Sequence, residues 1–158
     1  MANTQSMCTS FMGELMTATH NFGTAPTRGT SATDTFKAAL YLTSATVDAA
    51  TTAYSATNEV SGTGYTAGGV TVTAATPPTA TNSSATAGVA FFTPSASITY
   101  TTVTLATAFD AVLIYNSTQS NKAVSVHTFG SQTITAGTFT LTMPVNNTST
   151  ALLRLSTT

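Results

Sequence analysis

Two histidines and five carboxylates are the residues of this 158-residue chain that could transfer protons or hold a metal ion. His20 and His127 lie far apart in the sequence, and neither belongs to a recognisable carboxylate motif. The acidic residues are equally scattered: Glu14, Asp34, Asp48, Glu59 and Asp110. Their presence alone does not indicate a glycosidase pair. We expect turn or capping roles, especially for Asp34 and Asp110 beside predicted strands, and we predict no catalytic residue, no metal site and no cofactor.

The single cysteine, Cys8, excludes an internal disulfide and a cysteine-based metal cluster. No histidine, lysine or arginine lies near it in the sequence to lower its pKa. We therefore interpret Cys8 as a small apolar side chain within a helix.

A glycine-rich segment at 59–69 contains four of the ten glycines and superficially suggests a loop that binds phosphate. The GxGxxG spacing is not met, no helix is predicted after it, and the Lys-Ser/Thr pair of a P-loop is missing. We interpret these glycines as sites of backbone freedom, for a turn into a strand or for close contact with another subunit.

The composition separates this chain from ordinary enzyme domains. Only 6% of its residues are charged, against about a quarter in a typical domain, and roughly a quarter are threonine. Soluble monomers keep interspersed charges on their surface, so we expect neighbouring protein to cover much of this one. The net charge is −1, and the four basic residues are isolated (Arg28, Lys37, Lys122 and Arg154), which argues against a nucleic-acid partner.

The sequence also gives no indication of a membrane partner. No apolar run approaches the roughly 20 residues that span a bilayer, and no basic amphipathic stretch is present. The first residues lack the positive and apolar regions of a secretory signal. We expect synthesis and folding in a cytoplasm.

Apolar periodicity changes once along the chain. Met7, Phe11 and Leu15 recur at helical spacing, which predicts an amphipathic helix over about 6–22. Its methionines could lie on the domain's own sheet or in a neighbour's groove, and we favour the first. A loop is predicted over about 23–34, where Pro26 and Gly29 lie among threonine and serine.

Strands are predicted through the rest of the chain, because β-branched threonine suits a half-buried pleated surface. The run Ala111–Tyr115 is the most apolar and predicts a central strand covered on both faces. A hairpin loop is predicted at 116–121. Other strands are expected at 36–42, 70–73, 88–93, 98–107, 122–129, around 134–143 and at 151–155. The pattern favours a mainly β protein, an antiparallel β-sandwich of seven or eight short strands with an N-terminal α-helix, in a single domain over 1–158.

Three segments together resemble small virion structural proteins of tailed bacteriophages. They are MANTQSMCTSF at 1–11, TNEVSGTGYTAGG at 57–69 and AVLIYNSTQSNKAV at 111–124. Relatives often end in an Ile-Arg-Ile-like strand, where this chain has Leu153-Arg154-Leu155. The resemblance spans nearly the whole chain, implies a place in a phage head or tail made in the host bacterial cytoplasm, and brings no catalytic residues with it.

The resemblance and the composition lead to one main expectation. It is a non-enzymatic capsid decoration or cement protein on the virion surface, an oligomer whose partners are the major capsid protein and copies of itself. The candidate subunit contacts are Met7, Phe11, Leu15, Gly62, Gly64, Tyr65, Gly68 and Gly69. Two alternatives remain open: a tail-associated host-recognition module whose loop at 116–121 contacts a host-surface glycan, and a hydrolytic virion enzyme using Glu59 and Asp110.

Overall fold

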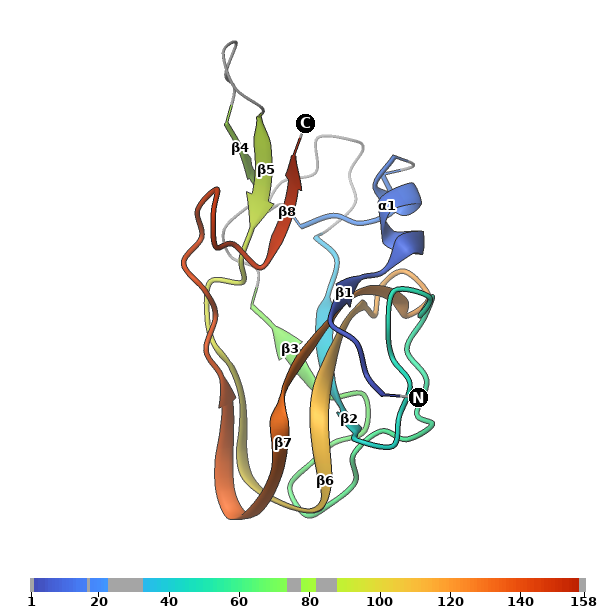
Figure 1. Cartoon of the computed structure of the whole chain (residues 1–158), viewed down its shortest axis with the longest axis vertical. Helices are drawn as coiled ribbons and strands as arrows, with labels where there is room; N and C mark the ends of the chain where they lie inside the picture. Colours follow the sequence, from blue (N-terminus) through green and yellow to red (C-terminus); the bar gives the residue numbers. More distant parts are fainter. Residues whose placement is uncertain (1, 17, 23–32, 74–77, 82–87, 157–158) are drawn as a thin grey trace.

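The computed structural model describes residues 2–16, 18–22, 33–73, 78–81 and 88–156. Within these ranges the chain forms one helix and eight strands in two antiparallel sheets (Figure 1). The elements are β1 (Ser6–Met7), α1 (Thr9–Met16), β2 (Phe36–Leu42), β3 (Val70–Val72), β4 (Thr79–Ala80), β5 (Val89–Phe92), β6 (Ile98–Asn116), β7 (Lys122–Leu141) and β8 (Leu153–Ser156). The prediction of a mainly β, antiparallel, sandwich-like fold with an N-terminal helix is confirmed.

One long hairpin, formed by β6 and β7, builds most of the body. The two strands have 19 and 20 residues and pair from Asn116 with Lys122 to Ile98 with Leu141. Register shifts interrupt the pairing between Tyr100 and Ala111, and one more lies between Ile114 and Tyr115. Such irregularities bend a strand, and the hairpin curves around at the lowest part of Figure 1 and rises again. The hairpin therefore supplies strand segments to two facing layers.

The predicted strand lengths were wrong for this hairpin. The strands expected at 98–107 and 111–115 are parts of β6, and those expected at 122–129 and 134–143 are parts of β7. Antiparallel pairing continues through the bulges. The short turn predicted at 116–121 is confirmed as the connection between the two strands, although Asn116 itself is the last residue of β6.

The central strand of the larger sheet lies in the second half of β6. The strand order in this sheet is β1-β7-β6-β2-β3. Residues Ala111–Tyr115 pair with β2 on one side and β7 on the other, and each is 4% exposed or less. The prediction of a central strand covered on both faces is confirmed.

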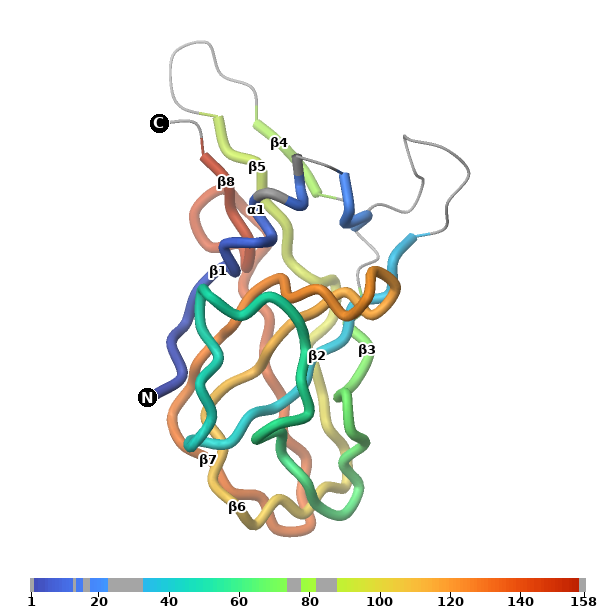
Figure 2. Tube along the Cα trace, turned by 90° about the vertical axis from the view of Figure 1, so that its right-hand side faces the viewer, coloured from blue at the N-terminus to red at the C-terminus, as the bar shows by residue number. Residues whose placement is uncertain are grey.

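The smaller sheet has the order β4-β5-β8 and stands at the top of Figure 1, beside α1. At the opposite, lower part of the molecule, residues 43–69 form a long connection without regular strands, which crosses the face of the larger sheet (Figure 2). Isolated bridges attach this connection to the sheet, between Tyr41 and Glu59, between Ala53 and Lys122, and between Thr63 and Thr104.

The predicted N-terminal helix is shorter than the range 6–22. Ser6 and Met7 pair with β7 as a strand, so the helix begins only at Thr9. After the helix, Ala18 has a positive φ of 52°, and Thr19 N donates to the Glu14 carbonyl. This pattern is typical of a Schellman motif, which ends a helix. The predicted loop at 23–34 lies outside the described residues except for its last two positions.

Cys8 precedes the helix and is not part of it, so that interpretation was wrong. Its backbone N–H donates to the Val124 carbonyl, and its own carbonyl accepts from Phe11 N. The side chain is fully buried in the core, as a small apolar residue would be.

No helix within the described ranges is long and apolar enough to cross a bilayer.

Candidate functional site

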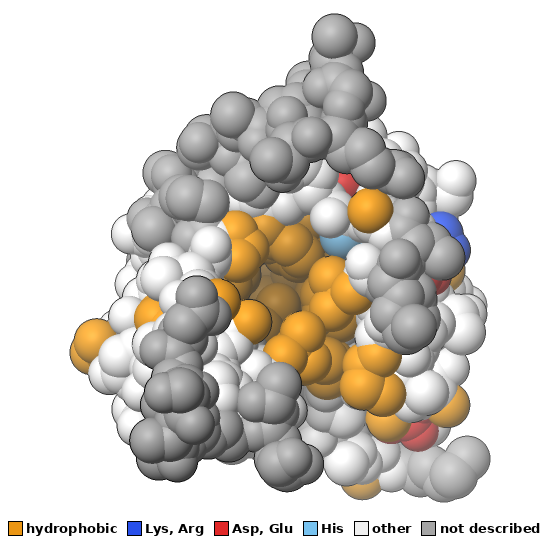
Figure 3. Space-filling model, turned by 90° about the horizontal axis from the view of Figure 1, so that it is seen from above, with side chains coloured by type: hydrophobic (Ala, Val, Ile, Leu, Met, Phe, Trp, Pro, Cys, Tyr) orange, Lys and Arg blue, Asp and Glu red, His pale blue; other side chains and the backbone are white. Residues whose placement is uncertain are grey.

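An apolar hollow opens at the end of the molecule that carries α1 and the smaller sheet. Figure 3, which looks onto this end, shows apolar side chains gathered around a depression. The cavity measures about 80 Å³. Its lining comes from α1, β5, β8 and the segments beside them: Met7, Phe11, Leu15, Phe22, Pro78, Ala90, Phe91, Phe92, Leu153, Arg154 and Leu155. We call this site the apolar hollow.

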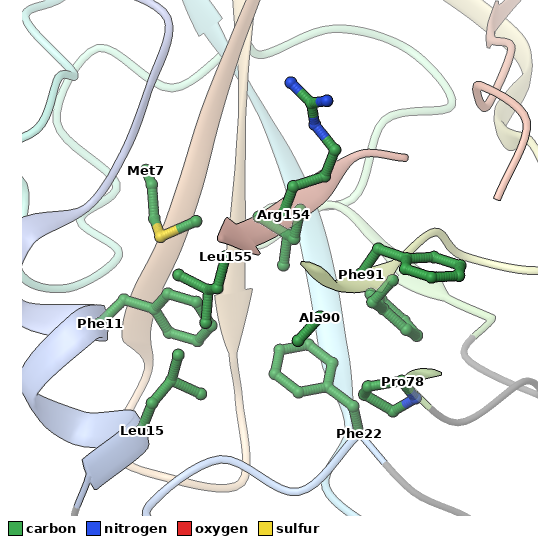
Figure 4. Close-up of a pocket in the computed structure, with 11 residues that line it drawn as sticks. Met7, Phe11, Leu15, Phe22, Pro78, Ala90, Phe91, Arg154 and Leu155 are labelled. Carbon is green, nitrogen blue, oxygen red and sulfur yellow. The ribbon is translucent and has the colours of Figure 1, made fainter. Parts of the chain in front are cut away.

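Strand alternation places one apolar face of the smaller sheet toward the hollow. Ala90 pairs with Leu155 and Phe92 pairs with Leu153, so these four side chains share a face. The intervening Arg154 points its guanidinium away from Leu155 (Figure 4). Its Nη1 donates to the Thr148 carbonyl at 3.2 Å. The single cation of this strand therefore lies at the rim of the hollow.

Aromatic rings form the floor of the hollow. Phe22 stacks on Phe36 with centroids 4.2 Å apart, and it contacts Phe92 at 4.9 Å and Phe11 at 6.0 Å. Figure 4 shows Phe11 and Leu15 reaching from α1 toward Leu155, across from Phe22. A packed aromatic floor of this kind holds its shape.

Beneath this floor a buried polar network joins the helix region to the hairpin. Asn116 Nδ2 donates to Asp34 Oδ2 at 2.7 Å and lies 3.1 Å from His20 Nδ1. With Asn116 as the donor, Nδ1 accepts, which assigns the His20 proton to Nε2. That proton is donated to Glu14 Oε2 at 2.7 Å. Both ring nitrogens are thus bonded to protein groups, and the His20 side chain is 0% exposed.

Lys122 completes this network from the start of β7. Its Nζ lies 2.5 Å from Glu14 Oε1. Burial raises the pKa of the Glu14 carboxyl, but the hydrogen bonds from Lys122 and His20, together with the charge of Lys122, outweigh burial, so the pKa is lowered overall. Glu14 is therefore held as a carboxylate that fastens α1 to the hairpin.

The second histidine lies elsewhere, on β7. Its Nε2 is 2.9 Å from Ser125 Oγ, and burial lowers the pKa of His127 to about 4. Burial, followed by the charges of Asp48 and Glu14, raises the pKa of the Cys8 thiol to about 11. Both groups are accordingly neutral near pH 7. Across the part of the chain that the structure describes, no three His, Cys, Asp or Glu side chains gather closely enough to hold a metal ion.

The glycine-rich segment lies away from the hollow, in the lower part of Figure 2. Gly69 has φ +73°, and a Cβ built there would lie 1.6 Å from the Ala38 carbonyl oxygen. At Gly62 the nearest atom would be the Thr104 carbonyl oxygen, at 2.1 Å. Glycine is required at these positions for contacts inside the chain. A further contact with another subunit stays a prediction.

A carboxylate in the same segment accepts hydrogen bonds from two of the five tyrosines, and the other three lie around them. Glu59 accepts from Tyr65 OH at 2.7 Å, from Gly68 N at 2.7 Å and from Tyr54 OH at 2.6 Å. Tyr100 stacks on Tyr65, and Tyr115 stacks on Tyr54. Tyr41 donates to the Ser55 carbonyl in the connection that holds Glu59. We call Glu59 and these tyrosines the Glu59 cluster. The Glu59 carboxylate therefore joins parts of the same chain and makes internal contacts.

The predicted contact residues therefore fall into two separate groups. Met7, Phe11 and Leu15 line the apolar hollow, whereas the predicted glycines and Tyr65 belong to the region of the Glu59 cluster. Sequence reasoning missed Phe22, Phe91 and Leu155 as lining residues. The alternation in β5 and β8 was the available signal, but it does not reveal which elements face each other.

Asp34 was expected to have a turn or capping role, but its side chain makes more contacts than such a role needs. Its side chain accepts from Asn21 N, Asn116 Nδ2 and Gln119 Nε2, which join the segment before β2 to the hairpin turn. Asp110 accepts from Asn3 Nδ2 and ties the N-terminal segment to β6.

Comparisons with protein-family models, with curated proteins and with solved structures found no match to this chain.

Proposed function

We propose that this chain is a non-enzymatic structural protein of a bacteriophage virion, a decoration or cement protein that binds the head shell. The observation that carries the proposal is the apolar hollow, which opens at one end of the molecule. An apolar site rimmed by polar residues is typical of a surface that binds another protein.

The distribution of charge supports the same proposal. Eight of the nine charged residues lie in the described ranges, and only Arg154 among them is well exposed. Glu14 and Asp34 are engaged in the network beneath the hollow, and Glu59 is engaged by tyrosines. Most of the described charged groups thus serve internal contacts, and the described surface carries few of the mixed charges that keep a free monomer soluble.

We assign the hollow to the major capsid protein, which would insert an apolar side chain between α1 and β8. Many equivalent contacts on a shell give strong overall attachment even when each contact is weak. Copies of this chain are the expected lateral neighbours. The glycine-rich segment is a second candidate contact, since Gly62 and Gly64 are exposed.

The test is binding to phage heads that lack this protein. Purified protein is added, and the heads are sedimented and heated. We expect co-sedimentation and a higher temperature of head rupture. Leu155→Asp, which places a charge in the hollow, should weaken binding at least about tenfold, since burying an unpaired charge is costly. The matched control is Val145→Asp, because Val145 is 71% exposed and does not line the hollow.

Two results would contradict this proposal. One is a protein that remains monomeric, fails to bind heads and binds host cells tightly. The other is equal loss of head binding in Leu155→Asp and Val145→Asp. A copy number near that of the shell protein is expected for a decoration protein, whereas a few copies per particle would place the chain on the tail.

The host-recognition module remains the alternative candidate. Its expected contact loop is the turn after β6, but two amides there have internal partners. Asn116 Oδ1 accepts from Thr118 N and Gln119 N, and Gln119 Nε2 donates to Asp34. Thr118, Ser120 and Asn121 are the exposed residues of the turn. Contact of this turn with a host-surface glycan stays a prediction.

A further inference from the structure

A second cavity, lined mostly by polar residues, lies between the edge strand β3 and the start of β6. It measures about 340 Å³, which is within the range of small-molecule sites. It is distinct from the apolar hollow, because the two share no lining residue. Its lining includes Lys37, Tyr65, Thr66, Thr71, Tyr100 and Thr101.

Lys37 contributes an unneutralised positive charge to this cavity. It lies on β2, paired in register with Thr71 of β3. All five side-chain carboxylates are in the described ranges, and the ion pairs found there join Glu14 to His20 and Lys122. Within the described residues, no side-chain carboxylate therefore lies within ion-pair distance of Lys37. A half-buried ammonium without a counter-ion favours binding of an anion.

Several threonines line the same cavity as Lys37. Thr66, Thr71 and Thr101 are exposed, and within the described residues their hydroxyls form no hydrogen bond. Each hydroxyl can donate one hydrogen bond and accept two. The cavity therefore presents several groups of the kind that pair with the hydroxyls of a sugar.

Two tyrosine rings hold one wall of the cavity in place. Tyr65 and Tyr100 stack with centroids 5.9 Å apart. Their hydroxyls are fastened, since Tyr65 OH donates to Glu59 and Tyr100 OH donates to the Ala38 carbonyl at 2.8 Å. A wall that is already ordered loses little entropy when a ligand binds.

From this arrangement we infer that the cavity binds an acidic carbohydrate, a sugar unit that carries a carboxylate. The carboxylate pairs with Lys37, and the sugar hydroxyls pair with Thr66, Thr71 and Thr101. The inference does not depend on the proposed function, because the hollow and this cavity are separate sites.

The test is an NMR titration of the full ¹⁵N-labelled chain with D-glucuronate, with D-glucose as the uncharged match. We expect saturable shifts at the amides of Gly64, Gly69 and Thr71, with dissociation constants in the millimolar range. Glucose should bind at least about tenfold more weakly, because it lacks the charge-assisted contact with Lys37. Lys37→Met should lose about tenfold in glucuronate affinity, and Lys37→Arg should retain most of it.

The matched control is Arg154→Gln, which removes an exposed charge outside the cavity and should leave glucuronate affinity unchanged. Thermal unfolding of each variant verifies that it is folded. The inference is overturned if glucuronate gives no saturable shift up to roughly 50 mM, if Lys37→Met binds as wild type, or if sodium sulfate moves the same amides equally. Head binding by the wild-type protein is measured separately, so either proposal can fail alone.

Discussion

The Glu59 cluster and the apolar hollow both bring together residues that are distant in sequence. The polar groups of the Glu59 cluster are bonded to one another, whereas the apolar side chains of the hollow lie at the surface. In the Glu59 cluster, backbone and tyrosine donors surround the carboxylate, so each of its oxygens accepts within the chain. Around the hollow, the polar atoms bond beneath an aromatic floor and leave apolar side chains at the surface. The first region stabilises the fold, whereas the second remains available to a partner.

The largest expected difference between the regions concerns alkaline pH. Burial raises the pKa of Tyr41 to about 12, and burial followed by contact with Glu59 raises that of Tyr54 and Tyr65. Because the ordinary value is 10.0, the unfolded chain releases these protons first, and stability present below pH 10 is lost as pH rises toward 12. Tyr41 alone accounts for roughly 2 kcal/mol at pH 12.

Phenolate absorbance and circular dichroism, recorded together, measure this effect. We expect both to change in a single transition well above pH 10. Tyrosine ionisation at its ordinary pH, with the β-sheet signal intact, would show that the Glu59 cluster is open to solvent.

Substitution of a single glycine should distinguish the Glu59 region from the hairpin. Gly69→Ala forces a side chain against the Ala38 carbonyl at a positive φ, and we expect a loss of roughly 4 kcal/mol in the free energy of unfolding. Gly130→Ala is the matched control, because nothing lies within 4 Å of its Cβ. Urea denaturation measures both, and equal stability of the two variants would refute the tight fit at Gly69.

The carboxylate of the Glu59 cluster is tested by Glu59→Gln. The amide cannot accept at both positions, and its NH₂ group faces a tyrosine hydroxyl or a backbone N–H. We expect a loss of about 3 kcal/mol in unfolding free energy, since hydrogen bonds to a charged group are stronger than neutral ones. Asp110→Asn makes the same chemical change where one side-chain contact is found, and urea denaturation should show a smaller loss. A larger loss of unfolding free energy in Asp110→Asn than in Glu59→Gln would contradict this prediction.

Lys122→Met tests the network beneath the hollow. Lys122 is 39% exposed, so solvent weakens its pair with Glu14. We expect a loss of about 0.5–1 kcal/mol, measured by urea denaturation near neutral pH. Because the Glu14 pKa is lowered in the folded state, its contribution to wild-type stability should decline as pH falls through the acid range. If Lys122→Met lowered the free energy of unfolding as much as Glu59→Gln does, the two networks would contribute equally to stability.

The smallest expected effect on stability is at the hollow itself. Leu155 is 42% exposed, so Leu155→Asp should change the free energy of unfolding by no more than about 0.5 kcal/mol while weakening head binding. Leu113→Ala, at a fully buried position, provides the contrast and should cost about 3 kcal/mol. A large loss of stability in Leu155→Asp would mean that the hollow belongs to the core and not to a binding surface.

Local sequence patterns were sufficient for the fold class and for parts of several elements. Alternation and β-branched residues identified parts of six of the eight strands and missed β1 and β4, and the apolar run Ala111–Tyr115 identified the centre of the sheet. These predictions succeeded because side-chain period and turn chemistry act over a few residues. The helix was placed near the N-terminus for the same reason, but pairing of Ser6 and Met7 with β7 shortened it.

The tertiary structure alone decided the sites. Glu59 meets tyrosines from the connection and from strands up to residue 115, and the hollow joins α1 to strands near the other end of the chain. Composition and the Met7, Phe11 and Leu15 pattern indicated one side of the hollow, whereas Phe22 and Leu155 could not be placed. The reason is physical: a strand's sequence specifies which residues share a face, but chain crossing and sheet packing determine what that face meets.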